Sequence, residues 1–283
     1  MQYFHVDVFS SQPLSGNGLT VVFPDKELSD QSLLEITREF KQFETIFIYP
    51  KTADDSFPVR IFTVDEELGF AGHPVLGAGA VIHQLFYSNH SIAEITINLS
   101  GRKVIIKSEL SGKVYDITMN QGQPEFMSRI TPFEFKTISG ALNLEESDLY
   151  PDYPLEVIST GLPYLLVPVK NALPKAKITH PDFESLLAGY GAKFVYVFDP
   201  ETIECRTWDN RGDVEDIATG SAAGPLCAYL VKNGFKQKDN LISISQGRFV
   251  NRPSIIYGWV SQTNNEVFIR GRVSFFGIGE LFI

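Results

Sequence analysis

Cysteine is scarce in this sequence, which has only two among 283 residues, Cys205 and Cys227. Neither cysteine belongs to a C-x-x-C pair or lies near other residues at metal-ligand spacing, so the sequence argues against a disulfide scaffold and against a metal site. Positive charge is also scarce, because 24 Lys and Arg residues stand against 34 Asp and Glu residues, for a net charge of −10. Nucleic-acid binders carry a basic surface, so we expect a small-molecule partner and no nucleic acid.

Long apolar runs are absent as well. The first residues, MQYFHVDVFS, lack the basic stretch and apolar segment of a secretory signal, and no apolar run reaches the length of a membrane span. We therefore expect a cytoplasmic protein without a membrane partner. The glycine pairs Gly16/Gly18 and Gly77/Gly79 lack the third glycine of a dinucleotide-binding motif, which argues against a nicotinamide cofactor.

Two segments that are apolar on nearly every helical face are the most informative features that are present, FAGHPVLGAGAVI and IATGSAAGPLCAYL. A short helix that is apolar all round must be buried. His73 is the predicted N-cap of the first helix because proline follows it, and Ser221 is predicted to open the second. Aligned on their starts, the two segments place Gly72 over Gly220 and His73 over Ser221, which indicates a weak internal repeat.

Strand-like segments flank both apolar helices and predict an α+β fold of two domains, each a curved sheet around one buried helix. The turn-rich segment NQGQPEFMSRITPFEF predicts the boundary between them. We expect one domain over 1–125, completed by a C-terminal strand over about 275–283, and a second over 126–274. The segment LSDQSLLEITREFK predicts a further amphipathic helix capped by Ser29.

Four polar residues stand at the ends of the predicted elements, namely Glu44, His73, Asp216 and Ser221. A helix start with glycines can bind an anion, and a carboxylate in a partly dry cleft can serve as a base. These residues also have structural interpretations. A Ser or His at a helix start usually caps the helix, and acidic residues before a helix complement its dipole.

Six segments resemble the successive signatures of the PhzF-like family, which is named for a phenazine-biosynthesis isomerase. They are VDVFSSQPLSGNGLTVVF, FETIFI, VRIFTVDEELGFAGHPVLGAGAVI, STGLPYLLVPV, EDIATGSAAGPL and QGRFVNRPS. The resemblance covers essentially the whole chain. It implies a diaminopimelate epimerase-like fold, with two pseudo-symmetric domains that are each an antiparallel β-barrel around a central helix.

The resemblance also implies a cofactor-independent isomerase of a small cyclic amino and hydroxy carboxylate. Glu44 matches the glutamate that moves a proton between two carbons, and His73 and Asp216 match residues that hold polar groups of the substrate or assist proton movement. The remaining matches are substrate-binding residues, namely Asn17, Gly72, Gly220 and Ser221. Family members are often dimers, so the resemblance also implies a homodimer, with no metal and no cofactor.

Two departures separate this sequence from related patterns. The epimerases of this fold use a cysteine immediately before each helix-opening glycine, whereas Ala71 and Thr219 stand there and neither can act as a thiolate base. Ile217 replaces the proline that PhzF-like members usually have, so the backbone next to Asp216 is expected to differ. An amino-acid epimerase and a non-catalytic carboxylate-binding protein remain the alternatives to the isomerase.

Overall fold

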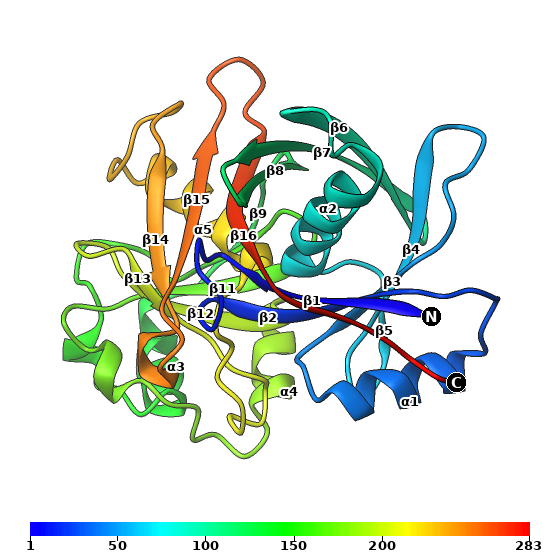
Figure 1. The fold of residues 1–283 in the computed structure, drawn as a ribbon. Helices are drawn as coiled ribbons and strands as arrows, with labels where there is room; N and C mark the ends of the chain where they lie inside the picture. The colour runs from blue at the N-terminus through cyan, green and yellow to red at the C-terminus, as the bar shows by residue number, and fades with distance from the viewer. The chain divides into compact units, whose positions relative to one another are not determined.

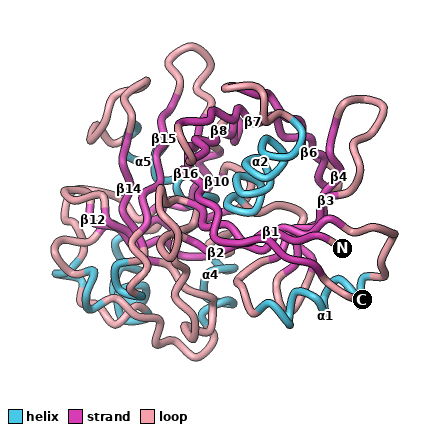
Figure 2. The backbone as a smooth tube through the Cα atoms, in the orientation of Figure 1, coloured by secondary structure: helices cyan, strands magenta, loops and turns pink.

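The computed structural model describes residues 1–283 and divides into two compact units. The first unit joins Met1–Asn120 to Arg270–Ile283, and the second is Gln121–Ile269. Each unit combines many strands with few helices, which confirms the predicted α+β class (Figures 1 and 2). None of the helices combines the length and apolar character that a membrane span requires.

The first unit is a closed barrel of eight strands around a helix. The pairing order is β1-β2-β3-β4-β6-β7-β8-β16, and β1 pairs with β16 to close it. Helix α2 contacts β1, β2, β3, β6 and β7, so it fills the barrel interior (Figure 1). The elements are β1 (Gln2–Val8), β2 (Asn17–Phe23), α1 (Asp30–Phe40), β3 (Thr45–Ile48), β4 (Ser56–Phe62), β5 (Glu67–Leu68), α2 (Gly72–Phe86), β6 (Ile92–Leu99), β7 (Arg102–Ser111), β8 (Val114–Gly122) and the later part of β16 (Val267–Glu280).

Small residues allow the barrel wall to approach α2 closely. A Cβ atom added to Gly77 would overlap Leu19 on β2, and one added to Gly79 would overlap Ile106 on β7. Every residue of α2 from Gly72 to His83 is buried, which confirms the prediction that this helix is enclosed. The apolar composition of the segment follows from its place inside a packed barrel.

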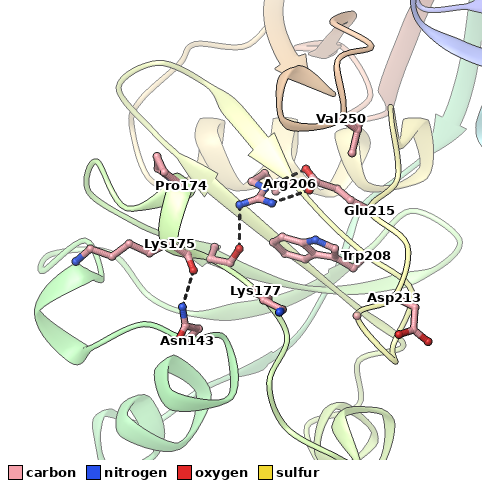
Figure 3. Close-up of a pocket in the computed structure, with 11 residues that line it drawn as sticks. Asn143, Pro174, Lys175, Lys177, Arg206, Trp208, Asp213, Glu215 and Val250 are labelled. Carbon is pink, nitrogen blue, oxygen red and sulfur yellow. Dashed lines mark hydrogen bonds and ion pairs between the residues drawn. The ribbon is translucent and has the colours of Figure 1, made fainter.

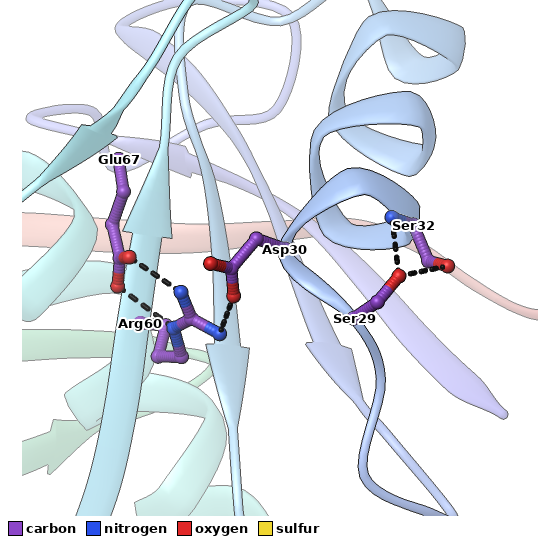
Figure 4. A network of polar contacts seen from close by, with 5 residues as sticks. All are labelled: Ser29, Asp30, Ser32, Arg60 and Glu67. Carbon is purple, nitrogen blue, oxygen red and sulfur yellow. Dashed lines mark hydrogen bonds and ion pairs between the residues drawn. The ribbon is translucent and has the colours of Figure 1, made fainter.

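Helix α1 packs on the outside of the same barrel through one apolar face. Ser29 caps it as predicted, because the Ser29 hydroxyl accepts a hydrogen bond from the Ser32 backbone N–H at 3.2 Å (Figure 4). Leu33 and Ile36 are buried in a cluster with apolar residues of β2, β3 and β4. The chain then turns at Lys41, which has a left-handed φ of 54°, and reaches β3.

The second unit is a sheet in the order β16-β15-β14-β13-β12-β11-β10-β9 with helix α5 packed against β10, β11 and β15. Residues of α5 from Gly220 to Leu230 are buried, as predicted. The elements are β9 (Glu125–Arg129), η1 (Pro132–Glu134), α3 (Phe135–Ala141), η2 (Glu146–Asp148), β10 (Glu156–Ser159), β11 (Pro163–Pro168), η3 (Leu173–Lys175), α4 (Phe183–Gly189), β12 (Phe194–Asp199), β13 (Glu204–Arg206), α5 (Gly220–Lys232), β14 (Ile242–Gln246), η4 (Arg248–Val250), β15 (Ser254–Val260) and the first part of β16.

The same sequence of pairings occurs in both units. In the first, β2–β3 and β4–β6 are parallel, and in the second β11–β12 and β13–β14 are parallel. Each parallel pair is joined by a crossover that contains a helix, in order α1, α2, α4 and α5, because parallel neighbours cannot be joined by a tight hairpin. The sheets are therefore mixed, with antiparallel pairings in the majority, rather than purely antiparallel as expected.

Candidate active site

Glu44 and His73 meet in the first unit. Glu44 lies between α1 and β3, and His73 is the second residue of α2, so two elements far apart in sequence bring them together. His73 Nε2 lies 3.2 Å from Glu44 Oε2, and the two residues are only 5% and 7% exposed. Burial lowers the pKa of His73 to about 3, so the imidazole is neutral at neutral pH and the contact joins a carboxyl group to a neutral ring.

Both buried helices begin without a side-chain cap. The N-cap of α2 is Ala71 and that of α5 is Thr219, and neither side chain bonds to the helix start. The prediction that His73 caps α2 is therefore wrong, as is the prediction that Ser221 opens α5, because each is the second residue of its helix. The N-cap side chains thus supply no acceptor to the first backbone N–H groups of α2, which opens at Gly72, or of α5, which opens at Gly220, and helix starts of this kind suit an anion.

Asp216 lies in the loop before α5 and folds back onto that loop. Its Oδ1 accepts a hydrogen bond from the Ala218 backbone N–H at 3.4 Å, and its Oδ2 accepts one from the Thr219 hydroxyl. The Asp216 N–H donates to the Thr207 carbonyl at 3.0 Å. The carboxylate is therefore held close to the start of α5. Ile217 lies in the short stretch of chain that these two hydrogen bonds close, between Asp216 and Ala218.

Sequence reasoning missed the residues that support the start of α5. Tyr164 places its hydroxyl 2.8 Å from the Ser221 hydroxyl. Gln121 donates to the Gly220 carbonyl at 3.0 Å. The Gln246 side chain donates to the Asp216 carbonyl at 2.9 Å and accepts from the Thr219 backbone N–H at 3.1 Å. Tyr164 and Gln246 belong to the family-like segments STGLPYLLVPV and QGRFVNRPS, and this was the only signal for them in the sequence, since nothing in their spacing indicated a contact with α5.

Asn17 is the first residue of β2 and is 1% exposed. It follows Gly16, whose φ of +75° and closeness to the Val8 carbonyl leave no room for a side chain. The SGNG turn thus places Asn17 opposite Val8 at the end of the first hairpin. The pairing of β1 with β2 fixes the position of Asn17, and the contact between Glu44 and His73 plays no part in it.

The segments before both helices are each anchored by an arginine and a glutamate. In the first unit, Arg60 on β4 makes two hydrogen bonds to Glu67 on β5, at 2.8 and 2.5 Å (Figure 4). In the second, Arg206 on β13 makes two to Glu215, at 2.9 and 2.6 Å (Figure 3). A pocket of about 610 Å³ in the second unit is lined by Arg206, Glu215 and Trp208, and none of the site residues predicted from sequence lines it.

The model of the family described as "Phenazine biosynthesis-like protein" matches residues 6–276 of this chain. The chain belongs to this family. A relative from Pseudomonas chlororaphis, named trans-2,3-dihydro-3-hydroxyanthranilate isomerase, is 31% identical over 273 residues, which cover 90% of this chain and 88% of that protein. Two relatives that each match 90% of this PhzF-like chain are named isomerases. The chain is an enzyme of that class.

Solved structures agree with the PhzF-like fold. A Pseudomonas aeruginosa protein described as a predicted epimerase is 41% identical, with a TM-score of 0.94 and coverage of 100% of this chain and 99% of that one. A probable proline racemase from Agrobacterium radiobacter is only 13% identical, with a TM-score of 0.61 over 100% of this chain and 93% of its own. At that identity the likeness concerns the fold alone.

Proposed function

We propose that this PhzF-like chain is a cofactor-independent isomerase that moves a proton within a small cyclic amino and hydroxy carboxylate, with Glu44 as acid and base. The observation that carries the proposal is the buried contact of 3.2 Å between Glu44 and His73 at the uncapped start of α2. A carboxyl group, a neutral imidazole and a helix start whose N-cap side chain accepts no hydrogen bond together form a site for proton transfer next to a bound anion.

Glu44 would act in two balanced steps. Its carboxylate takes a proton from one substrate carbon, and the electron pair of that C–H bond spreads into the conjugated ring. The protonated Glu44 then returns the proton to a different carbon, so no oxidant or reductant is needed. His73 stays neutral because its pKa is about 3, and its ring lies close enough to orient the Glu44 carboxyl group.

The substrate carboxylate would be bound at a helix start. Gly72 opens α2 and Gly220 opens α5, with Ser221 next in the chain, and backbone N–H groups at such starts favour anions. Asp216 would hold a polar group of the substrate, and Asn17 would be a further substrate-binding residue.

An amino-acid epimerase is the second candidate, favoured by the description of the 41% identical structure as a predicted epimerase. Ala71 and Thr219 stand where a two-thiol epimerase needs its bases, and the two cysteines of this chain lie elsewhere. Both cysteines are buried, which raises the pKa of each thiol and opposes the thiolate form. Inversion would therefore need Glu44 and a second group that is not a thiol.

The experiment is proton NMR in deuterated water with trans-2,3-dihydro-3-hydroxyanthranilate and a panel of cyclic and linear amino and hydroxy acids. We expect deuterium to enter a ring carbon with the wild type, and Glu44→Gln to reduce this rate by at least about 10³-fold, because the variant lacks the base. Glu39→Gln is the matched control, since it makes the same change at an exposed position of α1.

The outcomes separate the candidates. Exchange at an α-carbon with inversion would favour the epimerase, and binding without exchange over the whole panel would favour a non-catalytic binding protein. Full activity of Glu44→Gln would exclude Glu44 as the base. The cytoplasmic location and the homodimer remain predictions, which fractionation and light scattering can test.

A further inference from the structure

Gln246, the last residue of β14, is the centre of a buried hydrogen-bond network that includes Asp216 and Thr219. It is 1% exposed, and its side chain makes four hydrogen bonds. Its side-chain N–H groups donate to the Asp216 carbonyl at 2.9 Å and to the Thr219 hydroxyl oxygen at 2.9 Å. Its side-chain oxygen accepts from the Thr219 backbone N–H at 3.1 Å and from the Tyr196 hydroxyl at 2.8 Å. Both N–H donors and both lone pairs of the Gln246 amide are thus used.

The partners of Gln246 fix the orientation of its amide. The Asp216 carbonyl can only accept a hydrogen bond and the Thr219 backbone N–H can only donate one, so turning the amide round would break both contacts. The Gln246 nitrogen must therefore face the Thr219 hydroxyl oxygen. Because a hydroxyl has one proton and that oxygen already accepts from Gln246, the proton is directed to the other neighbour, Asp216 Oδ2.

We propose that Thr219 and Gln246 are positioning residues that hold the Asp216 carboxylate in place for substrate binding. This inference rests on the proposed function, in which Asp216 holds a polar group of the substrate. Thr219 stands where an epimerase has a base, yet its proton is donated to Asp216 and its oxygen accepts from Gln246. The hydroxyl thus orients a neighbouring carboxylate and takes no proton from the substrate. The same bonds restrict the loop that carries Ile217.

The kinetic test compares Thr219→Val, which removes the hydroxyl at similar volume, with Thr219→Ser, which retains it. With trans-2,3-dihydro-3-hydroxyanthranilate, we expect KM to rise about tenfold in Thr219→Val with kcat within about threefold, because a hydrogen bond to a charged group that binds substrate is lost. Thr219→Ser should restore KM to within about threefold of the wild type. Thr37→Val is the control for removing a buried hydroxyl, since Thr37 bonds only to the Leu33 carbonyl in α1.

A double-mutant cycle separates positioning from a general structural effect. In an Asp216→Asn background, Thr219→Val should change KM by less than about twofold, because the carboxylate that Thr219 orients is already absent. Equal effects of Thr219→Val in both backgrounds would overturn the proposal. A fall in kcat with unchanged KM, not rescued by serine, would also overturn it.

A second readout does not depend on turnover. The ¹H–¹⁵N signals of the Gln246 side-chain amide can be assigned by their loss in Gln246→Glu. In Thr219→Val one of the two amide protons loses its acceptor, so we expect an upfield shift and faster exchange with water for that proton, with neither change in Thr219→Ser. If the wild type fails to convert the probe but the amide signals respond in this way, the proposed function fails for that probe and the network stands. Unchanged signals in Thr219→Val would overturn the network itself.

Discussion

The two units anchor their buried helices with the same pair of residues in two different environments. Glu67 and Glu215 each lie five residues before the first residue of a helix, α2 and α5 respectively. Arg60 and Arg206 each make a pair of hydrogen bonds to the corresponding glutamate. Each arginine also lies over the ring two residues further along the chain, that of Phe62 at 5.0 Å in one unit and Trp208 at 4.7 Å in the other.

The environments of the two pairs differ. The side chains of Arg60 and Glu67 are 27% and 37% exposed, whereas those of Arg206 and Glu215 are 10% and 9% exposed. The remaining donor of Arg60 reaches Asp30, whose side chain is 83% exposed, while that of Arg206 bonds to the buried carbonyls of the η3 segment at 2.8 and 2.9 Å. The same pair of hydrogen bonds between arginine and glutamate should therefore stabilise the two units to very different extents, because burial removes the water that would replace a lost partner.

Arg206→Ala should have the largest effect. The substitution leaves the Glu215 carboxylate buried without its partner and removes the donor to two carbonyls, so we expect a loss of about 3–5 kcal/mol in the free energy of unfolding. Urea denaturation followed by tryptophan fluorescence measures it, since Trp208 and Trp259, the only tryptophans, both lie in the second unit.

Replacing both members of the buried pair tests the cause of that loss. In Arg206→Met combined with Glu215→Leu no charge is left unpaired, so the variant should lose less stability than Arg206→Ala alone. Equal losses in the two variants, or a loss below about 1 kcal/mol in Arg206→Ala, would contradict the distinction between a buried and an exposed anchor.

The second difference between the units is a titratable group at the second helical position, where α2 has His73 and α5 has Ser221. Burial lowers the His73 pKa from 6.5 to about 3. Between these values the unfolded chain binds a proton at this residue and the folded chain does not, so the free energy of unfolding should fall by about 1.4 kcal/mol per pH unit as the pH drops from 6.5 towards 3.

In His73→Gln the free energy of unfolding should change less steeply with pH, by about 1.4 kcal/mol per pH unit, which is the contribution of one bound proton. Chemical denaturation at several pH values between 4 and 7, followed by circular dichroism, gives the slope for wild type and variant. Ser221→Ala is the matched control, because it changes the equivalent residue of the second helix without removing a titratable group. Identical slopes in wild type and His73→Gln would mean that His73 has an ordinary pKa in the folded chain.

Local patterns in the sequence predicted the buried helices, the Ser29 cap and the repeat. A helix that is apolar on every face must be buried, so the burial of α2 and α5 followed directly from their composition. The helix caps were mispredicted because His73 and Ser221 are polar residues next to helix-starting signals, and residue type alone does not distinguish a cap from a second helical position.

The supporting contacts could not be predicted in the same way. The network of Gln246 with Asp216 and Thr219 joins β14 to a loop 27 to 30 residues earlier in the chain. The bond between Arg206 and the Leu173 carbonyl spans 33 residues. Such contacts depend on how strands are ordered in the sheet, which periodicity does not determine. The internal repeat offered one signal, since it places Glu67 over Glu215 once Gly72 is aligned with Gly220.

Arg60→Ala should have the smallest effect and completes the comparison between the two anchors. Its partners Glu67 and Asp30 remain hydrated when the guanidinium is removed, so the loss in the free energy of unfolding should be about 0.2–1 kcal/mol and should shrink further in 0.5 M salt. Circular dichroism during urea denaturation at low and high salt measures both quantities. A loss that equals that of Arg206→Ala and does not change with salt would show that exposure fails to separate the two pairs, and that each arginine acts mainly by packing over the ring beside it.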